Sequence, residues 1–321
     1  MLMKIAVLDD YQGVSTSLAD WSTLNADVAV FRETISGPPL IERLRPFDVI
    51  CLMRERTPMP AAALDALPNL KLLVTTGMRN LSIDVAAARS RGVTVCGTNG
   101  RGPSTAQLAM TMILAAMRGL IAEAVSMRGG GWQFGLGRDL HGLTLGLIGL
   151  GKQGAQMVEL AQPFGMNVLA WSQNLTDARC AEVGVERAAS LDDLLTLADA
   201  VSIHLVLSDR SRGLIGPQQL ARMKSDAVLV NTSRGPIVDQ GAVLEALRAD
   251  RLGAAAIDVF ETEPVARDDP VRDAALIDAG RLILTPHIGY VTRQTYEIFY
   301  RETVEAIAAW RAGAPIREIS S

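Results

Sequence analysis

Three charged or titratable side chains each follow an apolar, strand-like run in the second half of this 321-residue chain. They are Arg234 after Ala227 to Asn231, Glu263 after Gly253 to Asp258, and His287 after Arg281 to Leu284. His287 is one of three histidines, so few imidazoles could do acid-base chemistry. Because open α/β sheets place ligands at the carboxyl ends of their strands, we expect the three groups to meet at one sheet edge. Such a set could transfer a proton and stabilise negative charge.

A glycine-rich turn follows another apolar run. The run is Leu145 to Gly149, and Gly149 is the first glycine of the turn. Gly149, Gly151 and Gly154 have the spacing Gly-x-Gly-x-x-Gly, and a helix-like segment comes next. In dinucleotide-binding folds the first glycine allows a tight turn, the second lets the backbone approach a pyrophosphate, and the third lets the helix pack on the strand. Free N–H groups at the helix start would bind the pyrophosphate. We therefore expect a dinucleotide site here.

The same residues also fit the opening of a nucleoside triphosphate loop. Gly146 to Lys152 satisfies Gly-x-x-x-x-Gly-Lys. That loop needs Ser or Thr next, to bind magnesium, but Gln153 stands there, and Gly146 would lie inside the strand. The dinucleotide interpretation is favoured.

The residues expected to hold the adenosine ribose lack the usual acid. About 20 residues past the glycine loop, the second strand of a dinucleotide fold normally ends in an acid that binds the ribose hydroxyls. This position falls on Trp171-Ser172-Gln173-Asn174, which contains no acid and which no Arg or Lys follows immediately. We expect NAD as the cofactor, with NADP left open.

Short strand-like runs alternate with helical segments along the whole chain. The runs are Lys4 to Leu8, Asp27 to Phe31, Asp48 to Leu52, Leu70 to Thr75 and Val93 to Cys96, and then Leu145 to Gly149, Asn167 to Trp171, Ala200 to Ile203, Ala227 to Asn231, Gly253 to Asp258 and Arg281 to Leu284. Parallel strands need crossover helices, and right-handed crossovers build doubly wound sheets. The pattern predicts an α/β protein with two doubly wound parallel-sheet domains. A last helix is predicted over roughly Thr292 to Trp310.

The segment from Gly102 to Gly131 has a different composition. Pro103 and Ser104 open a stretch that is apolar nearly all round and ends at Arg128, which predicts one long helix buried at an interface. Its most apolar window, Ala106 to Met117, is too short to span a bilayer. We take Ser104 to Met117 as the candidate contact of a homodimer.

The composition is that of a globular chain, with 49% hydrophobic residues and a net charge of −4. No long basic run is present, so we expect neither nucleic acid nor a membrane as a partner, and small solutes instead. Cys51, Cys96 and Cys180 are too few and too scattered for a disulfide framework or a metal site, so no metal is expected. Asp9 and Asp10 stand where a signal peptide would continue its apolar stretch, which favours a cytoplasmic protein.

Taken together, the motifs resemble those of the D-isomer-specific 2-hydroxyacid dehydrogenases, a family that includes phosphoglycerate, glycerate and D-lactate dehydrogenases. The matching stretches are Arg91-Gly92-Val93-Thr94-Val95, the glycine loop, Met223 to Asp239, Asp258 to Pro264, and Thr285-Pro286-His287-Ile288-Gly289. The resemblance spans almost the whole chain. It implies a Rossmann domain over residues 100–289, inserted in a flavodoxin-like substrate domain made of residues 1–99 and 290–321.

The resemblance also implies roles for the three charged groups. Reduction of a 2-oxo acid adds hydride to the carbonyl carbon, so the oxygen needs a proton and a cation. His287 would donate the proton and Arg234 would polarise the carbonyl. Glu263, the acid directly before the proline, would orient the protonated imidazole, whereas Glu261 takes no catalytic role.

Substrate and cofactor residues follow from the same resemblance. The substrate carboxylate would be held by Arg234 and by main-chain N–H groups at Gly77 and Met78, with Arg54 as a second cation. Arg54, Arg56 and Arg79 could also meet a phosphate. Asp258 would accept a hydrogen bond from the nicotinamide carboxamide. The full set expected to bind the cofactor is Gly149, Gly151, Lys152, Gln153, Gly154, Ser172, Gln173, His204, Thr232, Asp258 and Gly289.

Two other functions stay open at this point. The family has a corepressor branch, which implies the alternative of a catalytically silent, NAD(H)-binding regulatory protein. Formate dehydrogenase fits less well, because its relatives pair the histidine with Gln, whereas Glu263 stands here.

Overall fold

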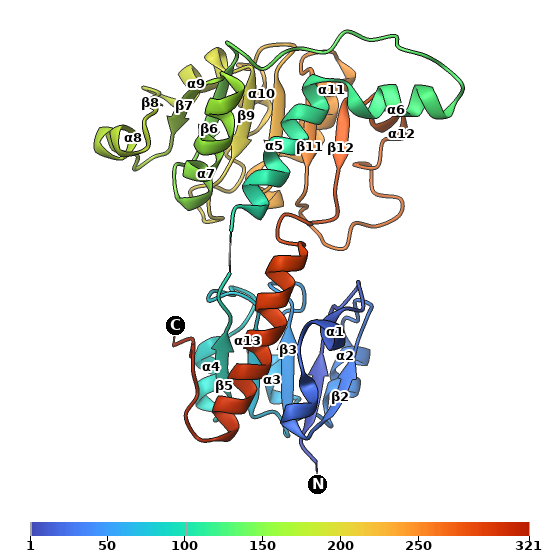
Figure 1. Ribbon diagram of the computed structural model, residues 1–321, viewed down its shortest axis with the longest axis vertical. Coiled ribbons are helices and arrows are strands. Elements are labelled where there is room, and N and C mark those ends of the chain that lie inside the picture. Colours follow the sequence, from blue (N-terminus) through green and yellow to red (C-terminus); the bar gives the residue numbers. More distant parts are fainter. Residues whose placement is uncertain (1, 101, 321) are drawn as a thin grey trace. The chain divides into compact units, whose positions relative to one another are not determined.

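The computed structural model describes residues 2–100 and 102–320, so residues 1, 101 and 321 lie outside the description. The chain divides into two compact units (Figure 1). Unit 1 comprises Met1–Gly102 and Val291–Ser321, and unit 2 comprises Pro103–Tyr290. Each unit is a parallel sheet with helices on both faces, so the predicted fold class is confirmed.

Unit 1 has a five-stranded sheet in the order β2-β1-β3-β4-β5, which is the flavodoxin-like order. Its strands are β1 (Lys4–Val7), β2 (Asp27–Val30), β3 (Val49–Leu52), β4 (Leu72–Thr75) and β5 (Thr94–Gly97). All of them pair in parallel. The side chains of β3 and β4 are all buried and those of β1 and β5 mostly so, as expected of strands covered on both faces, whereas the edge strand β2 has no buried residue.

Two groups of helices cover this sheet. In the first group, α1 (Ser15–Leu18) and η1 (Trp21–Leu24) pack against the C-terminal helix α13 (Arg293–Arg311). The second group is α2 (Pro38–Leu44), α3 (Ala61–Asp65) and α4 (Val85–Ser90), which share a core with β3. Beyond α13, Ile319 N donates to Val95 O at 2.8 Å and Gly97 N donates to Arg317 O at 2.8 Å. The C-terminal segment therefore covers the free edge of β5, which removes an exposed strand edge.

Unit 2 has a seven-stranded sheet in the order β12-β11-β10-β9-β6-β7-β8. This is the Rossmann order with one further strand at an edge. The strands are β6 (Thr144–Ile148), β7 (Asn167–Trp171), β8 (Glu186–Arg187), β9 (Ala200–Ile203), β10 (Val228–Asn231), β11 (Ala254–Ile257) and β12 (Leu282–Leu284). The runs predicted from the sequence are all strands, to within two residues at their ends. Only β8 was not predicted, because its two residues are exposed and charged.

The helices of unit 2 form two layers. One core cluster joins α5 (Ser104–Met117), α7 (Lys152–Ala161) and α8 (Asp177–Val183) to one face of the sheet. The other cluster joins α9 (Leu191–Leu197), α10 (Pro217–Leu220), α11 (Gln240–Arg248) and α12 (Ala274–Asp278) to the opposite face. Two short 3-10 turns, η2 (Gln162–Phe164) and η3 (Gly235–Ile237), complete the unit.

The long helix predicted after Gly102 is two helices. α5 ends at Met117, and α6 (Leu120–Arg128) follows at an angle of 63°, because Gly119 between them has a left-handed φ of 58°. α5 packs on α7, β10 and β11, so its apolar surface belongs to the core of unit 2. This packing involves one side of α5, and residues such as Gln107, Thr111 and Ala115 are not buried, so a dimer contact of α5 stays a prediction.

No single helix in the described residues is long and apolar enough to cross a membrane. The bent pair α5 and α6 passes that test only when its two members are counted together.

The third glycine of the turn lets α7 pack directly on the backbone of the first glycine. A Cβ built on Gly154 would lie 2.2 Å from Gly149 O, so the helix could not keep its place. We predict that Gly154→Ala destabilises the fold by about 1–3 kcal/mol. A loss of stability would be informative, because Gly→Ala inside a helix otherwise raises the free energy of unfolding by up to about 1 kcal/mol.

Urea unfolding of the two proteins would measure this difference. The matched control is Gly241→Ala in α11, where the nearest atom to a new Cβ is Asp239 Oδ1 at 3.4 Å, an ordinary contact. Equal midpoints for wild type and Gly154→Ala would contradict the packing described here.

Candidate active site

The carboxyl ends of five strands of unit 2 lie in one row. Successive register partners at these ends are Ile148, Ile203, Asn231, Ile257 and Leu284. The residues that follow them are Gly149, His204, Thr232, Asp258 and Thr285. Because all the strands are parallel, the glycine turn and the loops that carry the three charged groups leave the sheet at the same edge.

The side chains of His287 and Glu263 form a short hydrogen-bonded pair at this edge. The distance between His287 Nδ1 and Glu263 Oε2 is 2.6 Å. The other carboxylate oxygen accepts a hydrogen bond from Phe260 N at 2.9 Å, which fixes the carboxylate. The ring of Tyr290 meets the imidazole edge to face, with centroids 5.6 Å apart. Since Nδ1 contacts Glu263, Nε2 is the ring nitrogen that a substrate would meet.

A buried carboxylate holds the loop of His287. Asp258 is fully buried, and its Oδ1 accepts from Thr285 Oγ1 at 2.5 Å and from Ile288 N at 2.8 Å, while its Oδ2 accepts from Gly289 N at 2.9 Å. Burial raises the pKa of Asp258, and these hydrogen bonds oppose the rise. His287 itself has a φ of 54°, a conformation that non-glycine residues rarely adopt. Asp258 thus stabilises the turn that places the imidazole.

This role of Asp258 and Gly289 was not predicted from the sequence. Gly289 also accepts a hydrogen bond from Thr105 Oγ1 at 3.1 Å, so both its polar backbone atoms serve the loop. A contact of either residue with the nicotinamide stays a prediction.

Arg234 follows β10 in a loop ordered by its own neighbours. Asn231 Nδ2 donates to Arg234 O at 3.0 Å, and Asn231 Oδ1 accepts from Ser233 N at 3.0 Å. The half-buried guanidinium donates to Ser233 O at 2.7 Å. A Cβ on Gly235 would lie 2.1 Å from Phe260 C, so the loops after β10 and β11 are in direct contact. This contact keeps the loop of Arg234 next to the loop of Glu263.

The glycine turn fits a pyrophosphate. Gly149 has a φ of 105°, which favours glycine. Gly151 caps the start of α7, no side chain among the described residues caps that end, and a Cβ on Gly151 would meet nothing within 4 Å. The space beside Gly151 is open, and an anion placed there would accept hydrogen bonds from the first N–H groups of α7.

Two buried polar atoms at the same edge also fit a bound cofactor. In the part of the chain that the structure describes, His204 Nδ1 and Thr232 Oγ1 are buried with no hydrogen-bond partner. His204 Nε2 lies 2.9 Å from Ser202 Oγ, and burial lowers the pKa of His204 to about 4, so its ring is neutral at pH 7. An unsatisfied buried group costs about 1–3 kcal/mol. A ligand with polar groups at this edge would remove that cost.

The remaining residues predicted to bind the cofactor lie around the same turn. Lys152 and Gln153 are exposed in the first turn of α7. Ser172 and Gln173 follow β7, and Gly149 N donates to Trp171 O at 2.8 Å, which keeps the two strand ends together. Sequence reasoning missed one neighbour, Arg179, which reaches Leu150 O from α8.

The residues predicted to hold a substrate carboxylate lie at strand ends of unit 1. Arg54 follows β3, has a φ of 54°, and donates from Nη1 to Thr76 O at 3.1 Å. Gly77 N donates to Thr98 Oγ1 at 2.9 Å, which fixes the loop, and a contact of Gly77 with a substrate stays a prediction. Met78 is exposed beside it. The N–H of Met78 likewise stays a predicted donor to the substrate.

A polar network at the end of β1 was also missed. Asp9 is buried, accepts from Thr57 Oγ1 at 2.7 Å and from the Tyr11 hydroxyl at 3.3 Å, and burial raises its pKa. The guanidinium of Arg56 lies 4.8 Å from the centre of the Tyr11 ring. The network joins the loop after β1 to the loop after β3. The adjacent acids Asp9 and Asp10 at a strand end were the available signal, since this is the edge where ligands bind.

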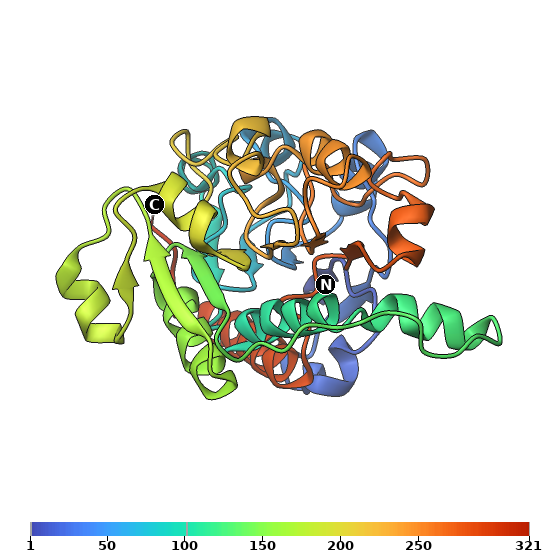
Figure 2. The same ribbon diagram turned by 90° about the horizontal axis from the view of Figure 1, so that it is seen from above.

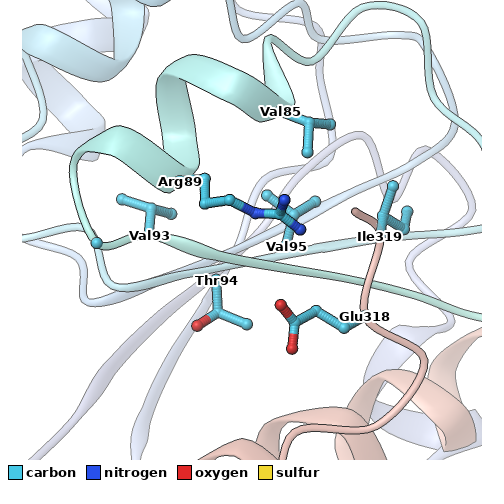
Figure 3. A pocket seen from close by; sticks show the side chains of 8 residues that line it. Val85, Arg89, Val93, Thr94, Val95, Glu318 and Ile319 are labelled. Atoms are coloured by element: carbon cyan, nitrogen blue, oxygen red, sulfur yellow. The ribbon is translucent and has the colours of Figure 1, made fainter. Parts of the chain in front are cut away.

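Two hollows in the surface lie away from these residues. One, of about 150 Å³, lies between α4, β5 and the C-terminal segment, with Val85, Val93 and Ile319 beside Arg89 and Glu318 (Figure 3). The other, of about 650 Å³, lies at the amino ends of β6 and β7. Neither contains a predicted site residue. No group of three or more possible metal ligands occurs in the described residues.

The buried neutral ring of His204 predicts a pH effect on stability. The pKa falls from 6.5 in the unfolded chain to about 4 in the fold, so the unfolded chain binds the extra proton between these values. Stability is therefore lost as pH falls from 6.5 to 4, by about 3 kcal/mol from this residue. Urea unfolding of wild type and His204→Asn across this range should show a shallower dependence in the variant. Parallel curves would show that the ring is not held neutral.

Comparisons with known proteins agree with the motifs. Residues 110–289 match the family model for the D-isomer specific 2-hydroxyacid dehydrogenase, NAD binding domain. A D-3-phosphoglycerate dehydrogenase of Archaeoglobus fulgidus is 31% identical over 98% of this chain and 58% of its own length. A glyoxylate reductase of Korarchaeum cryptofilum is 34% identical over 85% of this chain and 82% of its own length.

A solved structure agrees with them. The crystal structure of a phosphoglycerate oxidoreductase from Vibrio cholerae has a TM-score of 0.90 and 38% identity, and the match covers 98% of this chain and 100% of that one. The chain spans only 58% of the length of the Archaeoglobus protein. The activities named for these relatives are therefore not assigned to this chain by the comparisons. The matched model, the ordered motifs and the fold establish that the chain belongs to the D-isomer-specific 2-hydroxyacid dehydrogenase family.

Proposed function

We propose that this chain is an oxidoreductase that transfers a hydride between NAD and a small D-2-hydroxy acid or its 2-oxo acid. The observation that supports it best is the 2.6 Å contact of His287 with Glu263 at the sheet edge that also carries the glycine turn. An imidazole paired with a carboxylate beside a dinucleotide site can act as the general acid or base that transfers one proton with each hydride.

NAD, when bound, would supply or accept the hydride at the substrate's C2 carbon. His287 would donate its Nε2 proton to the oxygen on that carbon during reduction. Glu263 accepts from Nδ1, so it stabilises the charged ring and fixes its orientation. In oxidation the neutral ring accepts the alcohol proton. A positioned general acid of this kind contributes about 100- to 10,000-fold in rate.

Arg234 would stabilise the negative charge that develops on the oxygen. Its guanidinium is half-buried, and the direct packing of its loop on the loop of Glu263 supports a shared task. An electrostatic donor aimed at a developing oxyanion contributes about 3 to 4 kcal/mol. Its planar fork also suits a carboxylate.

Substrate binding in unit 1 would use Arg54 and the N–H of Met78. Arg54 pairs with Glu55 at 3.7 Å, and Arg56 stacks on Tyr11 at 4.8 Å, so these two cations already have neighbours that balance or cover them. Arg79, the third arginine predicted to meet a phosphate, is exposed, so glyoxylate, glycerate and 3-phosphoglycerate all stay candidate substrates.

A substrate panel separates an enzyme from a regulatory binding protein. NADH oxidation with glyoxylate, hydroxypyruvate or 3-phosphohydroxypyruvate would support the enzyme and name its substrate. Cofactor binding with no turnover across a broad panel of 2-oxo acids would favour the binding protein.

A homodimer through unit 2 is the partner that we propose, and the structure suggests a contact beside the predicted one at α5. α6 and residues 129–137 project from unit 2 as an arm (Figures 1 and 2). The arm is ordered by its own bonds, since Gly135 N donates to Glu123 Oε1 at 2.9 Å and Arg138 N donates to Met117 O at 2.7 Å. Its apolar side chains are nevertheless exposed, namely Leu120, Met127, Trp132, Phe134 and Leu136.

An exposed apolar surface on an ordered segment indicates an interaction site. The same arm in a second copy of the chain would bury it in a symmetric contact. The arm includes few charges, with only Glu123 and Arg128 between residues 120 and 137. This favours an apolar, self-complementary contact over a charged partner.

The acid-base role predicts the effect of one substitution. His287→Ala should lower the turnover number at least about 100-fold, because the alkoxide loses its proton donor. The affinity for NADH should change little, since the glycine turn is untouched. The matched control is Glu261→Gln, whose carboxylate is exposed and pairs with Arg212 at 3.7 Å. An unchanged turnover number in His287→Ala would remove this residue from the mechanism.

The arm predicts a change in oligomeric state. Replacing Phe134 with Ser and Leu136 with Asp should give a folded monomer, where wild type is a dimer, in light scattering after size exclusion. Leu81→Asp is the control, because Leu81 is an exposed leucine that belongs to unit 1 and not to the arm. A monomeric wild type, or a double variant that remains dimeric, would rule out this contact.

A further inference from the structure

The place where the adenosine ribose would bind is unusual in this chain. β7 pairs with β6, and Trp171 is the register partner of Ile148, so Ser172 leaves the sheet next to the glycine turn. NAD-specific Rossmann sites have an acid here, which binds the ribose hydroxyls and would repel a 2′-phosphate. Residues 172–174 are Ser, Gln and Asn. The feature that normally excludes a 2′-phosphate is missing.

A guanidinium reaches the same turn from the next helix. Arg179 lies in α8, and its Nε donates to Leu150 O at 3.2 Å, between the first two glycines of the turn. The N-cap residue Thr176 holds this end of α8, since its Oγ1 accepts from Arg179 N at 3.2 Å. About a third of the Arg179 side chain is exposed, so the group is both held in place and accessible.

The charges around Arg179 leave it effective as an anion ligand. Arg179 Nη1 lies 2.8 Å from Glu182, whose side chain is 68% exposed and therefore screened by solvent. The other acid of α8, Asp177, pairs with Arg187 at 2.9 Å. The two cations Arg179 and Arg187 thus balance the two acids Asp177 and Glu182. An NAD-specific site instead has the unbalanced negative charge of one acid beside the ribose.

We propose that Arg179, together with the hydroxyl of Ser172, binds the 2′-phosphate of NADP, so that this chain binds NADP as well as NAD. The inference rests on the dinucleotide site of the proposed function. The planar guanidinium binds phosphate through paired hydrogen bonds, and the contact with Leu150 keeps it beside the glycine turn, where the ribose would lie. Arg179 is thus a specificity residue for the cofactor.

Binding of NADP⁺ and NAD⁺ to the purified full chain, measured by calorimetry without substrate, tests the proposal. Wild type should bind NADP⁺ at least one-tenth as tightly as NAD⁺. Arg179→Ala should weaken NADP⁺ at least about tenfold and change NAD⁺ less than twofold. Arg222→Ala, an arginine paired with Asp192 at 3.5 Å and distant in sequence from this turn, is the matched control and should change neither.

Two further variants sharpen the result. Arg179→Lys keeps the charge but loses the planar fork, so its NADP⁺ affinity should fall between those of wild type and Arg179→Ala. Glu182→Gln removes the competing acid and should tighten NADP⁺ alone. An equal loss of both dinucleotides in Arg179→Ala would show that Arg179 only shapes the turn, and would overturn the proposal.

Failure of this proposal can be told apart from failure of the proposed function. A wild-type chain that binds NADP⁺ more than tenfold more weakly than NAD⁺ overturns the 2′-phosphate site and leaves the dehydrogenase intact. A chain that binds both dinucleotides but reduces no 2-oxo acid overturns the dehydrogenase and leaves this site intact. Binding of neither overturns both.

Discussion

The buried carboxylate of Asp258 is the interaction on which the candidate site depends. A charge without solvent contact is costly, and three hydrogen bonds from Thr285, Ile288 and Gly289 offset that cost. In return the bonds tie the loop of His287 to the end of β11. Gly289 also accepts from Thr105 in the first turn of α5. The imidazole is therefore positioned by the core of unit 2 rather than by a mobile loop.

The parallel register explains why much of the site could be predicted from the sequence. Arg234, Glu263 and His287 each follow a strand-like run, and parallel strands must end at one edge. The register partners Asn231, Ile257 and Leu284 lie in a row, so the three loops begin side by side. The prediction needed only the strand runs and the rule of parallel pairing. The glycine spacing similarly predicted the turn that leads into α7.

What could not be predicted depends on how far side chains and helices reach in space. Arg179 comes eight residues after β7 ends, and no spacing rule says that its guanidinium returns to Leu150. An apolar segment indicates that it is buried but not what covers it, and the packing of α5 on the sheet of its own unit could not be predicted from its composition. The bend at Gly119 was missed because a single glycine in an apolar run is a weak signal.

Backbone strain gives an independent indication of where ligands bind. Asn25 and Asp250 have positive φ where helical segments close, which is ordinary. Asp9, Arg54 and His287 also have positive φ, but they follow strands β1, β3 and β12 at the carboxyl edges of their sheets. Each costs about 1 kcal/mol or more and persists only where neighbours enforce it.

Those neighbours can be named for each of the three residues. Thr57 donates to Asp9, Arg54 N donates to Thr76 Oγ1 at 2.8 Å while Asn80 donates to Arg54 O at 2.6 Å, and Glu263 contacts His287. Strain that is enforced by several polar contacts at a ligand-binding edge fits a site shaped before its ligand arrives. The same strain in a loop without such contacts would relax, so its presence at the carboxyl edge of each sheet argues that both edges are prearranged.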